Sequence, residues 1–311
     1  MHRTGLLLVF LSAATLRAQA PDPVIPRDLM LKRMGQIVSE FEGDVCLAVR
    51  NLKTGETIEE RSDEKIRTAS VIKFPIMVEV FYQAHEGKLR LGEILEVDAA
   101  NQVVGSGILK DLHPGLKLTL RDAVVLMIVL SDNSATNLVI DRVGIDKVND
   151  RMRKLGLVQT QLFKKVFRPA TGQQTEETRK FGLGVTTARE MMTLMEKLAR
   201  RELVNREASE EMLSILRKQH YQDEVPRYLY PGETRRAELK IANKTGALDD
   251  LRNDVALVET PRGDYVFSVF CQNSRDRRWI PENAASVTIA RLSRLLFDYF
   301  WDAAKPIANP K

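Results

Sequence analysis

The first group of residues that could do chemistry is a serine followed three positions later by a lysine. Ser70 opens an expected helix, and Lys73 follows one turn later. This spacing places both side chains on one helix face, so the amine can reach the hydroxyl. Serine is a weak nucleophile until a neighbour accepts its proton, and an amine surrounded by other cations can do so. Taken alone, the pair is better explained as an N-cap serine and a solvated lysine.

A second cluster, Ser131-Asp132-Asn133, lies where one expected helix ends and the next begins. Its hydroxyl and amide could project from a tight turn into a cleft, while Asp132 could bond the backbone and hold the turn. A plain helix–helix turn capped by Asp or Ser would carry the same residues.

A third cluster, Lys244-Thr245-Gly246, ends an expected strand. Lys244 supplies a positive charge, Thr245 supplies a hydroxyl, and Gly246 would let a substrate backbone approach the strand edge. Each cluster alone could be an ordinary turn, but all three in this order at element boundaries should be rare by chance. Together they predict a nucleophilic serine site.

The elements that must position these clusters follow from hydrophobic periodicity and turn residues. An early pair of strands and three late strands predict one antiparallel five-stranded sheet in an α+β fold, flanked by N- and C-terminal helices, with an inserted all-helical lobe. The expected lobes are an α/β lobe (residues 21–69 and 220–311) and a helical lobe (70–219), forming one catalytic domain over 21–311. Residues 86–118 and 163–185 are expected to be irregular.

The expected helices are Arg27–Phe41, Ser70–Ala84, Thr119–Leu130, Ser134–Val143, Thr187–Arg200, Glu207–Gln219 and Ala284–Phe300. The expected strands are Val45–Arg50, Glu56–Glu60, Leu239–Lys244, Arg252–Glu259 and Tyr265–Gln272. The cleft between two such lobes is the usual place for a site.

Composition excludes several classes of protein. The 311 residues are 44% hydrophobic and 29% charged, with 47 Lys and Arg against 42 Asp and Glu. This is globular composition, and the basic residues form no run, so no nucleic-acid partner is expected. Four His and two Cys lack metal-ligand spacing, so no metal and no cofactor are expected.

The first 20 residues have the pattern of a signal peptide. A basic start is followed by a short apolar run and by the small residues Ala18-Gln19-Ala20. The run is too short to span a bilayer, so no membrane span is expected and the protein should be periplasmic or secreted. In an oxidising compartment Cys46 and Cys271 could form a disulfide, or could remain as two buried thiols.

The three clusters resemble those of the class A serine β-lactamases and, more broadly, of the penicillin-recognising serine acyl-transferases. The resemblance spans roughly residues 27–303. It includes the segments Gly105–Leu109, Leu118–Asp122 and Thr186–Met191. It implies a small β-lactam or peptidoglycan-like substrate. Nothing in the sequence demands more than a monomer, which is the expected state.

The resemblance also implies a role for each matching residue. Ser70 would be the acylated nucleophile, Lys73 would accept or relay its proton, and Ser131 would protonate the leaving nitrogen. The N–H groups of Ser70 and Ala247 would form the oxyanion hole.

The remaining matching residues would bind the substrate. Asn133 would bond its side-chain amide, and Lys244 with Thr245 would meet its carboxylate. Arg252 would be a second carboxylate anchor, or else an ordinary cross-strand charge.

The long loop departs from the resemblance. Class A enzymes carry there a glutamate that activates the deacylating water, typically within an E-x-x-L-N run. This chain has Phe167–Thr171 where that run would fall, and Glu176 and Glu177 are the only carboxylates between Asp150 and Glu190. The base is therefore Glu177, Glu176 or neither, and without one the acyl-enzyme would be long-lived.

Three functions remain open on the sequence. The first is a serine β-lactamase. The second is a D-alanyl-D-alanine carboxypeptidase or related esterase with the same machinery. The third is a β-lactam binder that is acylated and stops there.

Overall fold

A computed structural model describes residues 25–169, 175–229 and 239–302 of the chain. A five-stranded sheet lies at its centre, with the strand order β2-β1-β10-β9-β8 and antiparallel pairing throughout. The α+β fold with five antiparallel strands is therefore confirmed. The expected signal peptide, Met1–Ala20, lies outside the described residues. The strands are β1 (Asp44–Asn51), β2 (Thr57–Glu60), β8 (Lys240–Leu248), β9 (Leu251–Glu259) and β10 (Tyr265–Gln272).

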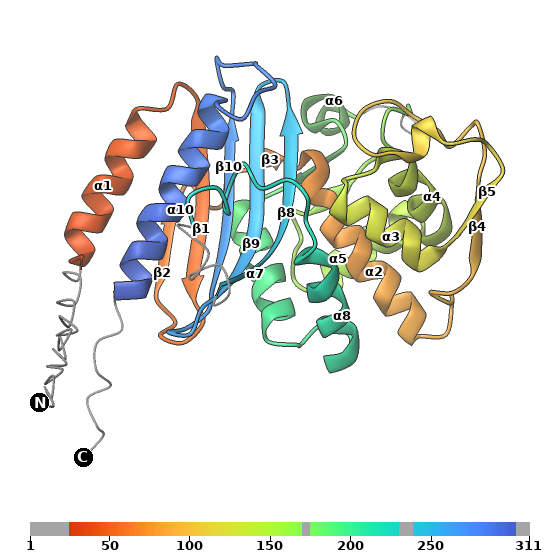
Figure 1. Cartoon of the computed structure of the whole chain (residues 1–311), viewed down its shortest axis with the longest axis horizontal. Coiled ribbons are helices and arrows are strands. Elements are labelled where there is room, and N and C mark those ends of the chain that lie inside the picture. Colours follow the sequence, from red (N-terminus) through yellow and green to blue (C-terminus); the bar gives the residue numbers. More distant parts are fainter. Residues whose placement is uncertain (1–24, 170–174, 230–238, 303–311) are drawn as a thin grey trace, which may run out of the picture.

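Two helices cover one face of this sheet, as Figure 1 shows. They are α1 (Arg27–Ser39) and α10 (Ala284–Asp302), which contact each other although they lie at opposite ends of the chain. Their apolar residues and the inward residues of the strands form one continuous core. Burial of this apolar area is the main force that holds the terminal helices on the sheet.

The other face of the sheet packs against α7 (Ala188–Ala199), beyond which lie the remaining helices. A second, larger core joins this face to them. These helices are α2 (Lys73–His85), α3 (Leu120–Val129), α4 (Asn133–Val143), α5 (Ile145–Lys154), α6 (Glu176–Phe181) and α8 (Arg206–Leu216).

Short elements connect these parts. A two-stranded sheet pairs β4 (Ile94–Val97) with β5 (Leu116–Thr119), inside the segment expected to be irregular. A three-stranded sheet has the order β3-β7-β6, and the described residues also include two single-turn 3₁₀ helices. These elements are β3 (Ile66–Arg67), β6 (Gln161–Leu162), β7 (Gly184–Thr186), η1 (Ala69–Ile72) and η2 (Leu109–Asp111).

The two cysteines are free thiols buried in different cores. On the neighbouring strands β1 and β10, Cys271 stands opposite Val45, one residue out of register with Cys46. Because successive side chains of a strand point to opposite faces, the two thiols lie on opposite sides of the sheet. The structure therefore has the two buried thiols rather than the disulfide.

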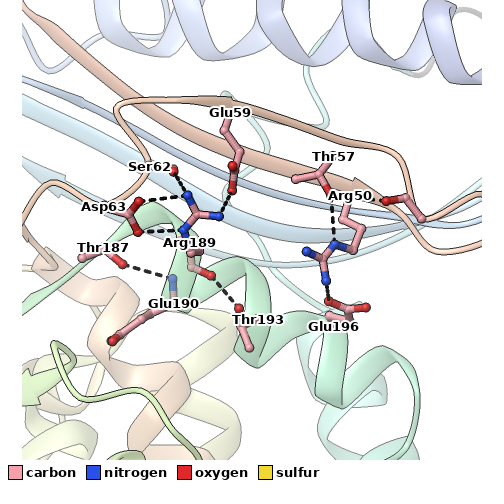
Figure 2. A network of polar contacts seen from close by, with 11 residues as sticks. Arg50, Thr57, Glu59, Ser62, Asp63, Thr187, Arg189, Glu190, Thr193 and Glu196 are labelled. Atoms are coloured by element: carbon pink, nitrogen blue, oxygen red, sulfur yellow. Dashed lines mark hydrogen bonds and ion pairs between the residues drawn. The ribbon is translucent and has the colours of Figure 1, made fainter.

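A polar network fastens the start of α7 to the edge of the sheet (Figure 2). The Arg189 guanidinium bonds the carboxylates of Asp63 and Glu59 and the Ser62 hydroxyl. On the same helix, Glu196 accepts a 2.8 Å hydrogen bond from Arg50 of β1. These contacts set the position of α7 behind the central strands.

Candidate active site

The serine of the first cluster lies in η1, immediately before α2. Ala69 has a φ of +43°, a left-handed conformation that costs a non-glycine residue about 1 kcal/mol. Strand β8 passes directly alongside, since a Cβ on Gly246 would stand 3.2 Å from the Ser70 nitrogen and 3.1 Å from the Val71 nitrogen. Gly246 was expected to admit a substrate backbone. In the structure it admits the backbone that carries Ser70.

The second cluster forms the junction of α3 and α4. Ser131 also has a positive φ, of 52°. Asp132 caps α4 by accepting a hydrogen bond from the Ala135 nitrogen, and its other oxygen accepts from the Ile108 and Leu109 nitrogens. Asp132 thus holds the turn, as expected, and also fastens the loop before η2 to it.

The Lys73 amine joins these two clusters. It is fully buried and donates to the Ser131 carbonyl (2.6 Å), the Ser131 hydroxyl (3.1 Å) and the Asn133 side-chain oxygen (2.8 Å). Ser70 Oγ is not among its hydrogen-bond partners in the described residues. Burial, and then the charge of Lys244, hold the pKa of Lys73 well below that of an ordinary lysine, against the opposing charge of Asp132. A lowered pKa suits this amine to accept a proton.

The third cluster, on strand β8, approaches the Ser131 hydroxyl from the side of the sheet. Lys244, also fully buried, lies 3.2 Å from Ser131 Oγ and donates to the Thr245 carbonyl at 2.8 Å. Burial lowers the pKa of Lys244 to about 7, while the negative charges of Asp254 and Glu224 oppose that shift. The Ser131 hydroxyl therefore lies within hydrogen-bonding reach of two buried amines.

A cavity of about 570 Å³ opens beside these residues. Six of the expected site residues line it: Ser70, Ser131, Thr245, Gly246, Ala247 and Arg252. The other three, Lys73, Asn133 and Lys244, are buried and connect to its wall through Ser131. The exposed rings of Tyr221 and Trp279, which also line the cavity, were not predicted from the sequence.

Arg252 lines the cavity, and it makes three hydrogen bonds to backbone carbonyls. The guanidinium donates to the carbonyls of Leu248, Leu251 and Arg278, and it lies 4.6 Å from the centre of the Trp279 ring. It is only 5% exposed. In the free protein these contacts tie the turn after β8 to the segment before α10.

Glu177 is the one expected catalytic residue that the structure does not bring to the cavity. Its carboxylate pairs with Lys65 at 2.8 Å, and both side chains are more than 40% exposed. Glu177 and the adjacent Glu176 form the first turn of α6 and do not line the cavity. Both glutamates belong to α6, a short helix in a segment that was predicted to be an irregular loop. This helix holds their side chains outside the cavity lining.

A different part of the long loop lies against the site. The buried Asn137 of α4 donates to the Val166 carbonyl (3.1 Å) and accepts from the Val166 nitrogen (2.8 Å). The next residue, Phe167, approaches the cavity wall, because a Cβ on Gly105 would stand 3.1 Å from its ring. The spacing of Asn137, four residues after Asn133 on one helix face, was the signal for it in the sequence.

We expect Asn137→Ala to lower the free energy of unfolding by about 1–3 kcal/mol, because it leaves two buried backbone groups unpaired. It should also lower activity by about 10- to 100-fold, since it frees the loop at the cavity wall. Asn149→Ala is a matched control, because Asn149 makes the same two bonds to Leu162 away from the cavity. Chemical denaturation and rate measurements would check both. Equal activity of the two variants would contradict the expectation.

The fold and the grouped serines and lysines define a class A β-lactamase fold. Among solved structures, a β-lactamase from Sphaerobacter thermophilus is 31% identical with a TM-score of 0.77, covering 88% of this chain and 97% of that one. A variant of PBP-A, solved as an acyl-enzyme complex with penicillin G, is 26% identical with a TM-score of 0.75, covering 90% and 99%.

Sequence comparison agrees. The profile of the β-lactamase enzyme family matches residues 30–300. A β-lactamase from Bacillus licheniformis is 22% identical over 258 residues, which is 78% of this chain and 75% of that protein. The chain therefore belongs to the β-lactamase enzyme family, a family of hydrolases.

Proposed function

We propose that the protein is an exported serine β-lactamase that opens the β-lactam ring through an acyl-Ser70 intermediate. The observation that carries the proposal is the Ser131 hydroxyl, which bonds two buried lysine amines on the wall of the cavity that Ser70 lines. A hydroxyl in such contact can pass a proton in either direction.

In the proposed acylation step, Ser70 Oγ attacks the carbonyl carbon of the ring and its proton passes to neutral Lys73. The N–H groups of Ser70 and Ala247 donate to the oxygen that becomes negative. The C–N bond then breaks, Ser131 protonates the nitrogen, and Lys73 returns a proton to Ser131. A water molecule completes the cycle by hydrolysing the ester.

In the proposed site, residues of both lobes bind the substrate. Lys244, Thr245 and Arg252 present positive charge and a hydroxyl to the substrate carboxylate. Asn133 would meet the side-chain amide, although its nitrogen already donates to the Val104 carbonyl at 3.0 Å and its oxygen accepts from Lys73. Asn133 would therefore share these bonds with the substrate.

We further propose that deacylation is the slower step. Glu177 is paired with Lys65, and residues 170–174 contain no carboxylate. The carboxylates that do line the cavity, Asp223 and Glu224, lie on its side next to Arg252 and Ser286, and no hydrogen bond joins either to Ser70 or Lys73 in the described residues. The acylated serine thus lacks an adjacent carboxylate base in this arrangement.

For this reason we expect Glu177→Gln to deacylate as the parent does, with Glu176→Gln as its matched control. Intact-mass measurements during the decay of the acyl-enzyme would compare the three proteins. An adduct that persists in Glu177→Gln alone would contradict this expectation. It would show instead that the Glu177 carboxylate leaves Lys65 to activate water.

The proposed function is tested by incubating the protein with a chromogenic cephalosporin while following colour and intact mass. Slow steady colour with a transient adduct is expected. A single burst with a permanent adduct would favour a binder that does not turn over. No adduct, together with D-alanine release from a peptidoglycan stem peptide, would favour the carboxypeptidase alternative.

Export and a monomeric state belong to the same proposal. The expected signal peptide supports export, and in the part of the chain that the structure describes no helix is long and apolar enough to cross a bilayer. A monomer is the simplest state, because nothing in the sequence demands a second chain. N-terminal sequencing of the secreted protein and gel filtration would test the two statements.

A further inference from the structure

A buried acid with no role in the proposed reaction lines the cavity beside Arg252. Glu224 is 6% exposed. Its Oε1 accepts a 3.0 Å hydrogen bond from the Ser286 hydroxyl of α10. In the described residues its other oxygen, Oε2, forms no hydrogen bond and is not fully buried. Half of this carboxyl group is therefore available to a molecule in the cavity.

The surroundings of Glu224 favour its neutral form. Burial, and then the nearby charge of Asp254, raise the pKa of Glu224 to about 8, against the opposing effects of the Ser286 hydroxyl and Arg252. Arg252 makes no ion pair with it in the described residues, because its donors go to backbone carbonyls. At neutral pH the group thus carries a proton, and a protonated carboxyl group can donate a hydrogen bond.

The other ionisable groups around Glu224 lie on three strands and on the adjoining segments. Asp254 accepts from the Asn243 side chain and the Val225 nitrogen, and burial raises its pKa to about 6. From α10 the contact is the Ser286 hydroxyl. The charged or titratable neighbours are Asp254 and Arg252 of β9, Lys244 of β8, Cys271 of β10, the adjacent Asp223, the Arg227–Glu282 ion pair, and Asp276, which acts on Arg252.

We propose that Glu224 is a substrate-binding residue whose protonated carboxyl group donates a hydrogen bond to the carboxylate of the substrate, beside Lys244 and Thr245. The inference rests on the proposed function and adds a pH limit to it. When Glu224 ionises, its negative charge faces the substrate carboxylate and removes the donor, so binding weakens as pH rises.

The test measures the half-saturating concentration of penicillin G for acylation between pH 7 and pH 9. In the parent this concentration should rise by more than tenfold, because both Glu224, with a pKa of about 8, and Lys244, with a pKa of about 7, lose a proton as the pH rises. Glu224→Gln should remove about a tenfold part of the rise, and what remains should reflect Lys244. Asp223→Asn, which removes a neighbouring exposed carboxylate, should keep the rise. The maximal acylation rate should not follow this profile.

Penicillin G methyl ester provides a test that needs no variant. It has no carboxylate, so its half-saturating concentration should not show the alkaline rise. A rise of equal size in Glu224→Gln, or with the ester, would overturn the inference and leave acylation of Ser70 intact. A parent that penicillin G does not acylate at any pH would overturn the proposed function itself.

Discussion

Ser70→Ala is expected to abolish covalent capture of a β-lactam, with a loss in acylation rate on the order of 10⁴-fold or more. The reason is that Ser70 lines the cavity from η1, next to Gly246 of strand β8. The Ser131 hydroxyl bonds both lysines, and the proposed mechanism uses it to carry protons. Stopped-flow mixing with a chromogenic cephalosporin and intact-mass spectrometry would measure the loss.

Ser106→Ala is the matched control for that experiment, because Ser106 also lines the cavity. It should be acylated at close to the parental rate. Adduct formation by Ser70→Ala at the parental rate would show that another group attacks the ring.

The second large effect is expected for Lys73→Met, which keeps the volume of the side chain and removes the amine. Acylation should fall by about 10²- to 10⁴-fold, the usual contribution of a positioned base. The free energy of unfolding should fall by about 1–3 kcal/mol, because the change leaves the buried Ser131 carbonyl and the Asn133 side-chain oxygen without their donor. A variant that is inactive and still folded separates a chemical role from a structural one.

The pH dependence of acylation also tests whether Lys73 is the base. Burial and Lys244 hold the pKa of Lys73 below its ordinary value, so the neutral amine persists to lower pH. The parent should therefore keep its acylation rate well below the pH at which an ordinary lysine becomes protonated. Unchanged acylation in Lys73→Met, or an acylation rate that falls off near the usual pKa of lysine, would contradict a role for this amine as base.

The five main strands and the terminal helices could be predicted because their patterns are strong. β9 and β10 are buried on both faces of the sheet, and each contains a run of apolar residues, Val255–Val258 and Tyr265–Phe267. α10 has apolar residues at helical spacing. The predicted helix Glu207–Gln219 corresponds to α8 (Arg206–Leu216), with its end shifted by three residues.

The missed elements are short or highly charged. The β4–β5 pair uses four-residue strands whose side chains are largely exposed, so they carry no clear alternation of burial. α5 has only Val148 and Met152 buried and follows Gly144, which has a φ of +83°. Such elements are fixed by tertiary contacts more than by local pattern.

The candidate site, like the fold, could be predicted only in part from the sequence. Ser70, Lys73 and Ser131 could be selected from motifs at element boundaries, but the hydrogen bonds of Lys73 to Ser131 and Asn133 were not predicted. The engagement of Arg252 by three carbonyls and the pairing of Glu177 with Lys65 depend on contacts between segments far apart in sequence. Glu224 lies in no motif, and its raised pKa arises from burial and from the charge of Asp254 in the folded chain.

Peptide mass spectrometry after a short incubation with penicillin G tests the attacking atom most directly. The account predicts an added mass equal to intact penicillin on the peptide that contains Ser70, and fragmentation that assigns it to that serine. An adduct on Ser131 or elsewhere, or no adduct in a protein that still consumes the drug, would contradict it.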